Sequence, residues 1–252
     1  MVRQFFVGGN TKMQVTFNSL NDIIENLNKA DLDDKTEKVL AVPSIYLSEA
    51  KNRLNPSIAV SAQNVYGKNT GAFTGEIAPT QLKDFDIKWT LTGHSERRHI
   101  FKENDDDVAM RTKGALNEQL NVIFCIGEKL EERESGKTKE VVQHQLNSLN
   151  KDISKEEWSK IVIAYEPVWA IGTGKVATPE IAQEAHKDIR QWLTTNLGQD
   201  AADSVRVIYG GSVSHTNCGD LAKQPDIDGF LVGGASVKPE FVHIINANQA
   251  NK

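Results

Sequence analysis

Eight short apolar runs recur along the chain, separated by stretches in which apolar residues repeat with helical spacing. Continuous runs rich in Val and Ile are typical of strands that are buried on both faces, as in a parallel sheet. We therefore expect strands at Phe5–Asn10, Val39–Val42, Ile58–Ala62, Trp89–Gly93, Val122–Gly127, Ile161–Tyr165, Val205–Tyr209 and Gly229–Gly233.

The segments between these runs predict amphipathic helices. The clearest helix has Thr178 as a fitting N-cap, Pro179 as its first residue and Gly198 just past its last turn. Helices are expected at Ser19–Ala30, Asp106–Gln119, Val141–Leu149, Pro179–Asn196 and Lys238–Ile245.

Eight repeats of strand and helix favour an α/β fold, a single (β/α)8 barrel with eight parallel strands over residues 1–252. Neighbouring parallel strands need long right-handed crossovers, and closing the sheet removes its edges. The pattern alone leaves an open, doubly wound sheet as the alternative.

Composition narrows the classes of function. A net charge of −5 argues against broad attraction to nucleic acid or anionic membranes, so an anionic substrate would need a local positive site. Cys125 and Cys218 lack metal-type spacing, and we expect reduced thiols. No apolar run is long enough for a signal segment or a membrane span, so a cytoplasmic protein is expected.

Polar residues and glycines gather at the ends of the predicted strands. In a barrel these ends converge on one rim, where the chemistry of such folds takes place. The rim groups are Asn10-Thr11-Lys12, Gln63-Asn64, Gly93-His94-Ser95-Glu96, Cys125 to Glu128, Glu166-Pro167, Gly210-Gly211-Ser212 and Gly233-Gly234.

Glu166 directly follows a predicted strand and is a candidate general base. The segment after it, from Pro167 to Gly174, has a rigid start, an apolar centre with Trp169 and Ile171, and a glycine-rich exit, as a hinged lid would. A carboxylate dried by such a lid has a raised pKa. Without this context, a solvated glutamate would be the better interpretation.

His94 and Lys12 are the other candidate reactive groups. With Ser95 as an N-cap, His94 would lie near a helix N-terminus, where the dipole keeps an imidazole neutral and able to donate a hydrogen bond. Strand alternation would direct Lys12 and Asn10 inward and Thr11 toward the outer helices. An interior ammonium suits a phosphate or an enediolate oxygen.

Two glycine pairs end the seventh and eighth predicted strands, Gly210-Gly211 and Gly233-Gly234, where barrels often bind phosphate through backbone N–H groups. The charge run from Glu128 to Glu134 is interpreted as a solvated helical face. Asn104 to Asp107 resembles a helix start, and Cys125 a buried structural thiol. No histidine has a metal-ligand partner at useful spacing, so no metal is expected.

Taken together, seven motifs resemble the triosephosphate isomerase family in the family's order, from Phe5 to Ile245. The most specific is AYEPVWAIGTG at Ala164–Gly174. The others are VGGNTK at Val7–Lys12, GAFTGE at Gly71–Glu76, GHSERR at Gly93–Arg98, CIGE at Cys125–Glu128, YGGS at Tyr209–Ser212 and FLVGGA at Phe230–Ala235.

The resemblance implies the interconversion of dihydroxyacetone phosphate and glyceraldehyde 3-phosphate, without metal or organic cofactor. Glu166 would move the proton, His94 would polarise the carbonyl oxygens, and Lys12 and Asn10 would add positive potential and polar contact. Glu96 would be a buried partner near Lys12. Phosphate would bind N–H groups at Gly172, Ser212, Gly233 and Gly234, and Tyr209 would help latch the closed lid.

The resemblance also implies a homodimer in which the segment Gly71–Glu76 docks beside the partner's active site. Thr74 would lie closest, and Met13 would be a further dimer contact. The chain departs from the family at Thr11, which is usually Trp or Phe, and at Gln14-Val15, which is usually Asn-Gly. Loss of an aromatic residue and a β-branched residue at a positive-φ turn predict weaker dimerisation or lower activity.

Two alternatives remain open at this level. One is a divergent copy with a structural or interaction role whose changes near Lys12 have weakened catalysis. The other is a barrel aldolase that uses a Schiff-base lysine, which would need a lysine within a middle or late strand, and those runs contain none.

Overall fold

Eight parallel strands close into a barrel in the computed structural model, which describes residues 3–171 and 177–248. Each strand pairs with the next along the chain, and β1 also pairs with β8, through Phe6 opposite Gly229 to Gly9 opposite Val232. This closure confirms the (β/α)8 barrel and excludes the open sheet. The strands are β1 (Phe6–Asn10), β2 (Glu37–Val42), β3 (Ile58–Ala62), β4 (Trp89–Thr92), β5 (Asn121–Ile126), β6 (Ile161–Tyr165), β7 (Arg206–Tyr209) and β8 (Gly229–Val232).

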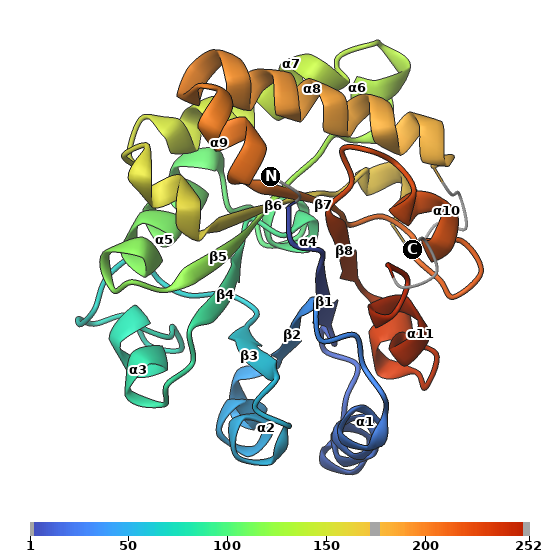
Figure 1. Cartoon of the computed structure of the whole chain (residues 1–252). Coiled ribbons are helices and arrows are strands. Elements are labelled where there is room, and N and C mark those ends of the chain that lie inside the picture. The colour runs from blue at the N-terminus through green and yellow to red at the C-terminus, as the bar shows by residue number, and fades with distance from the viewer. Residues whose placement is uncertain (1–2, 172–176, 249–252) are drawn as a thin grey trace.

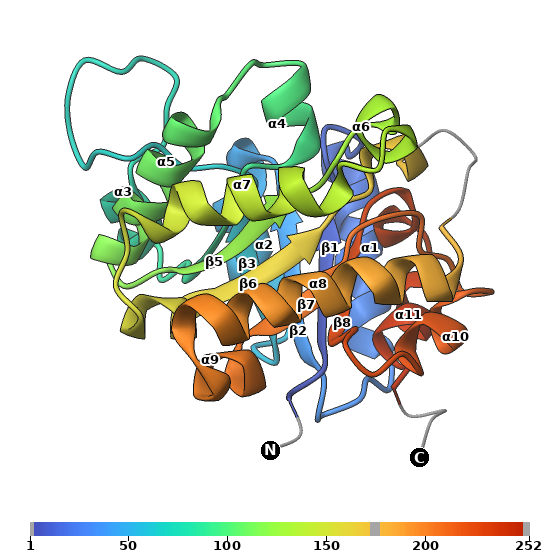
Figure 2. The same ribbon diagram turned by 90° about the horizontal axis from the view of Figure 1, so that it is seen from above.

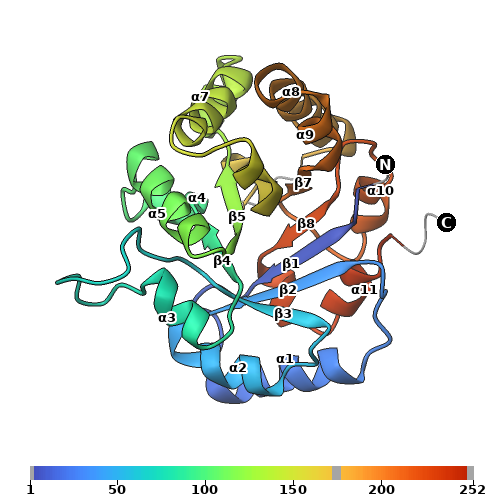
Figure 3. The same cartoon turned by 60° about the vertical axis from the view of Figure 1, so that its left-hand side comes forward.

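Helices surround the barrel in Figures 1 and 3. The longer ones are α1 (Phe17–Lys29), α5 (Asp105–Asn117), α7 (Thr138–Asn150) and α8 (Pro179–Leu197). Short helices are α2 (Leu47–Arg53), α3 (Pro79–Asp84), α4 (Ser95–His99), α6 (Leu130–Glu134), α9 (Gln199–Ser204), α10 (Cys218–Ala222) and α11 (Phe241–Ile245). Single 3-10 turns are η1 (Ser44–Tyr46), η2 (Glu156–Lys160), η3 (Val168–Ala170) and η4 (Gly234–Val237).

All five expected helices are present, with small differences at their ends. Thr178 caps α8 by accepting a hydrogen bond from the N–H of Ile181, and Asn104 caps α5 in the same way. The last helix begins at Phe241, because the extended backbone at Lys238 separates it from η4. The short helices α2, α3, α9 and α10 were not predicted, since few of their residues are buried.

The core has two layers. Alternate strand residues such as Phe6, Val39 and Ile123 fill the barrel interior, while the intervening residues pack against the surrounding helices. With both faces buried, the strands have the continuous apolar runs seen in the sequence.

The loop between β3 and α3 extends away from the barrel, at the upper left of Figure 2. None of the described helices is both long and apolar enough to cross a membrane.

Candidate active site

Glu166 lies immediately after β6 at the rim of the barrel and is 2 % exposed. Its Oε1 is 3.0 Å from Nε2 of His94, and its Oε2 accepts a 2.9 Å hydrogen bond from the N–H of Ser95. The strand register holds its backbone, because its N–H donates to the carbonyl of Ile126 on β5. Pairing with β5 thus fixes the backbone of Glu166, and the residues at the start of α4 hold its carboxylate.

Two glycines make room for this glutamate. A Cβ on Gly127 would lie 1.8 Å from the carbonyl oxygen of Glu166, and one on Gly210 would lie 2.9 Å from its Cγ. Any side chain at Gly127 would collide with backbone, so the base can occupy this position only beside glycine. These glycines therefore have a packing role that their motifs alone did not reveal.

His94 occupies the N-terminus of α4, as expected, but it is itself the N-cap. Its Nδ1 accepts a hydrogen bond from the N–H of Glu96 at 3.3 Å. The predicted N-cap, Ser95, is instead the first helical residue, and its N–H binds Glu166. Since Nδ1 accepts a hydrogen bond, the neutral ring carries its proton on Nε2, the atom nearest Glu166.

The two groups shift each other's pKa. Burial lowers the pKa of His94, but the negative charge of Glu166 and the hydrogen bond to it raise that pKa more. Burial raises the pKa of Glu166, yet His94, the Ser95 N–H and Lys12 lower it more. The expected raised pKa of Glu166 is therefore wrong for this arrangement, in which the carboxylate has strong donors. The expectation that the helix start favours a neutral His94 is wrong for the same reason, since Glu166 favours the charged ring.

Lys12 lies just beyond β1, and its Nζ is 2.8 Å from Oε1 of Glu96. The expected partnership is confirmed, although the Glu96 side chain is 41 % exposed and was wrongly expected to be buried. Asn10 and Lys12 line the same two cavities, as their expected inward direction requires, although the φ of +50° at Lys12 is not that of a strand. The hydroxyl of Thr11 donates to the carbonyl of Ala41 on β2.

These groups share a cavity of about 190 Å³. A Cβ on Gly233 would lie 3.3 Å from Cε of Lys12, so the last strand end approaches the first. The lining residues are Asn10, Lys12, Gln14, His94, Glu166, Ile171, Gly210, Gly211, Val213, Leu231, Gly233 and Gly234. Ser212 lies between two of them, while Gly172 and Gly174 are outside the described residues.

Trp169 lies on η3, which begins directly after Pro167, and its Nε1 donates to Oε1 of Glu128 at 2.9 Å. Glu128 is fully buried and also accepts from the hydroxyl of Tyr165, so its assignment to a solvated face is wrong. The sequence signal was its place as the last residue of the CIGE motif, two residues after β5 ends. Tyr209 is fully buried, and burial raises the pKa of its hydroxyl more than the backbone of Ala177 lowers it.

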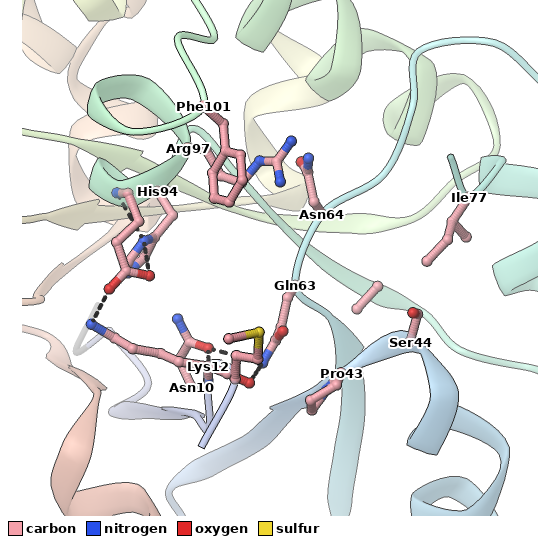
Figure 4. Close-up of a pocket in the computed structure, with 13 residues that line it drawn as sticks. Asn10, Lys12, Pro43, Ser44, Gln63, Asn64, Ile77, His94, Arg97 and Phe101 are labelled. Carbon is pink, nitrogen blue, oxygen red and sulfur yellow. Dashed lines mark hydrogen bonds and ion pairs between the residues drawn. The ribbon is translucent and has the colours of Figure 1, made fainter. Parts of the chain in front are cut away.

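A second cavity of about 330 Å³ lies between Lys12 and the residues that follow β3. Figure 4 shows the residues that line it. Gln63 and Asn64 line it from the end of β3, and Phe101 from beyond α4. Met13, at its edge, is 95 % exposed. Thr74 lies on the exposed part of the β3–α3 loop.

The departures at Thr11 and Val15 produce less strain than expected. Thr11 is fully buried with its hydroxyl hydrogen-bonded, and Val15 packs against the main core. Val15 is absent from the residues with positive φ, so the expected strain at that position is wrong. Gln14 is exposed beside the smaller cavity.

Both cysteines are buried free thiols, and burial, followed by the charge of Glu166, raises the pKa of Cys125, as suits a structural thiol. Within residues 3–171 and 177–248, no three His, Cys, Asp or Glu side chains gather as metal ligands would.

Comparison with known proteins agrees with this geometry. The family model described as triosephosphate isomerase matches residues 5–248. A triosephosphate isomerase of Paracoccidioides lutzii is 60 % identical over 247 residues, covering 98 % of this chain and 99 % of the relative. Those of Emericella nidulans and Aspergillus oryzae are 59 % and 57 % identical, again over 98 % of this chain and 99 % of each relative. The chain belongs to the triosephosphate isomerase family.

Proposed function

We propose that the chain interconverts dihydroxyacetone phosphate and D-glyceraldehyde 3-phosphate by proton transfer through an enediolate, a step of glycolysis and gluconeogenesis. Glu166 is the base that takes the proton from one substrate carbon and returns it to the next. Its Oε2 accepts the N–H of Ser95 and its Oε1 lies 3.0 Å from Nε2 of His94, and the carboxylate keeps lone pairs free to take a substrate proton. Its contact with Nε2 of His94 supports this assignment.

His94 and Lys12 stabilise the negative charge that develops on the substrate oxygens. The Nε2–H of His94 is the donor that faces the cavity, and the ammonium of Lys12 adds positive potential beside it. Asn10 supplies a polar contact, and Glu96 holds the ammonium by its ion pair.

The phosphate binds N–H groups at Gly233 and Gly234 at the start of η4, together with those of Ser212 and Gly172. Short glycine turns leave their amides open to an anion, and the nearby Lys12 complements its charge. The lid runs from Pro167 to Gly174, with Trp169 and Ile171 as its apolar centre and Tyr209 as a latch. Closure of the lid excludes water from the enediolate intermediate, which would otherwise eliminate its phosphate group.

One observation carries this proposal, namely that Glu166, His94 and Lys12 surround a single cavity bounded by two glycine turns. Coupled turnover of glyceraldehyde 3-phosphate tests it. Glu166→Asp withdraws the carboxylate by about one methylene and should reduce kcat by about a hundredfold or more. Glu166→Gln should lose more, while Glu131→Gln, at an exposed position on α6, should match the wild type.

No turnover by the wild-type chain, or full activity of Glu166→Gln, would contradict the proposal. Absence of turnover would favour the alternative of a divergent copy with a structural or interaction role. Nothing in the described residues supports that alternative.

We further propose that the chain forms a homodimer and acts in the cytoplasm. Exposed apolar side chains support the dimer, with Met13 and Phe101 at the larger cavity and Ile45 and Phe85 nearby. The segment Gly71–Glu76, with Thr74 foremost, is the element that would enter the partner's cavity. Two free buried thiols suit a reducing compartment.

Sedimentation tests the dimer. A monomer at micromolar concentration would refute it, and a tight dimer at nanomolar concentration with ordinary turnover would refute the weakening predicted from Thr11, Gln14 and Val15. Replacement of Met13 by Asp should shift the equilibrium toward monomer, because it would place a charge in an apolar contact.

A further inference from the structure

The backbone of Lys12 has an unusual conformation for a residue with a side chain. Its φ of +50° lies in the left-handed region, which persists where surrounding contacts fix it. Two side chains hold its peptide groups. The N–H donates to Oδ1 of Asn10 at 3.0 Å, and the carbonyl accepts from Nε2 of Gln63 at 2.9 Å.

Thr11 connects this arrangement to the barrel wall. Its hydroxyl donates to the carbonyl of Ala41 at 3.1 Å, and the same oxygen lies 3.4 Å from Nε2 of Gln63 as an acceptor. The side chain is fully buried. A hydroxyl can donate and accept at once, which a methyl group or an aromatic ring at this position cannot do.

The amide of Gln63 therefore lies among three acceptors, with Oδ1 of Asn10 at 3.3 Å as the third. Figure 4 shows Gln63 extending from β3 toward the backbone between Asn10 and Lys12. The backbone sets the direction in which the Lys12 side chain leaves the chain, and from this conformation its Nζ lies 2.8 Å from Oε1 of Glu96 and close to the Gly233 turn.

We propose that Thr11, through its hydroxyl and Gln63, is a positioning residue for Lys12, taking over with hydrogen bonds a place that is usually aromatic in the family. The inference rests on the proposed role of Lys12 in binding the substrate. Thr11 itself touches neither the smaller cavity nor the reacting atoms.

The test is Thr11→Val, which keeps the shape and removes the hydroxyl. Loss of one buried hydrogen bond that aims Lys12 should raise KM for triose phosphate and the inhibition constant of inorganic phosphate by about fivefold to tenfold. We expect a smaller change in kcat, because Glu166 and His94 keep their contacts. Thr11→Ser restores the hydroxyl and should recover most of the affinity.

The matched control is Thr90→Val on β4, another fully buried threonine whose hydroxyl donates to a backbone carbonyl, that of Leu91. It removes a similar bond away from Lys12, so it can lower the melting temperature without changing KM. All proteins are compared at concentrations where sedimentation gives the same oligomeric state. Equal KM and phosphate affinity in Thr11→Val and Thr90→Val would overturn the inference.

Gln63→Met provides a second test that does not depend on Thr11→Val folding well. It should weaken phosphate binding similarly, and the double variant should be no weaker than the stronger single variant, since both act through one contact. Additive losses would overturn the inference. Neither result would affect the proposed function, which fails if the wild type does not turn over triose phosphate or if Glu166→Gln keeps full activity.

Discussion

At the scale of single residues, Glu166 and His94 form a coupled acid–base pair in which each stabilises the charged form of the other. The lowered pKa of Glu166 means that its contribution to stability is present above its unfolded pKa and is lost as the pH falls through its folded pKa. The raised pKa of His94 means that its contribution is present below its unfolded pKa and is lost as the pH rises through its folded pKa. The pair is therefore most favourable between these limits.

Glu166→Gln should lower the pKa of His94, because it removes the charge that raises that pKa and leaves burial to lower it. Titration of the imidazole signals by NMR measures this shift. His99 serves as the internal control, since its pKa is lowered by burial and by Lys129, which the substitution does not touch. An unchanged or increased pKa of His94 in the variant would show that Glu166 is not its main partner.

At the scale of elements, the turn η3 depends on one buried carboxylate. Glu128 accepts hydrogen bonds from Tyr165 and Trp169, and its carbonyl accepts the N–H of Val168. Arg133 lies over the Trp169 ring at 4.9 Å. The first turn of the proposed lid is therefore attached to β6 and α6. Any motion of this turn that displaces Trp169 must break the contacts of its indole ring with Glu128 and Arg133.

Glu128→Gln should destabilise the protein by about 1–3 kcal/mol. The substitution removes the negative charge that strengthens the hydrogen bonds from Tyr165 and Trp169, and it replaces one accepting oxygen with an NH2 group that cannot accept. Thermal unfolding measures the loss, and Trp fluorescence reports the change around Trp169. Glu131→Gln, an exposed glutamate three residues farther along, is the control. Equal melting temperatures for the two variants would contradict the assigned anchoring role.

The same elements show which structure could be predicted from the sequence. The strands were predictable because burial on both faces leaves continuous apolar runs, and Glu166, His94 and Lys12 followed from their places at strand ends. The CIGE motif placed Glu128 at a strand end, but its burial could not be predicted, because it depends on Tyr165 and Trp169 from another strand end. The role of Gln63 likewise depends on a turn at Lys12 that strand alternation cannot anticipate.

At the scale of the whole molecule, a buried histidine makes the free energy of unfolding depend on pH. His186 is fully buried between helix α8 and the barrel, its Nδ1 lies 3.1 Å from the carbonyl of Asp226, and burial lowers its pKa to about 3. Between the ordinary pKa of histidine and about 3, the unfolded chain binds a proton that the folded chain does not. Stability should therefore fall as the pH falls through this range.

His186→Gln removes this proton linkage and keeps a polar side chain near Asp226. The loss of stability between pH 7 and pH 4 should be smaller than in the wild type, by up to about 3 kcal/mol. Urea unfolding at a series of pH values measures it, with His215→Gln, at an exposed position, as the control. Parallel pH profiles for wild type and His186→Gln would contradict the prediction.

The pairing of β1 with β8 has a consequence for how the protein becomes active during synthesis. Lys12 leaves the ribosome well before Gly233 and Gly234, and the cavity that these residues share forms only when all of them are present. A nascent chain that stops before its eighth strand has the lysine, the histidine and the glutamate but lacks the turn proposed to bind phosphate. Incomplete chains should thus leave the triose phosphate pool untouched.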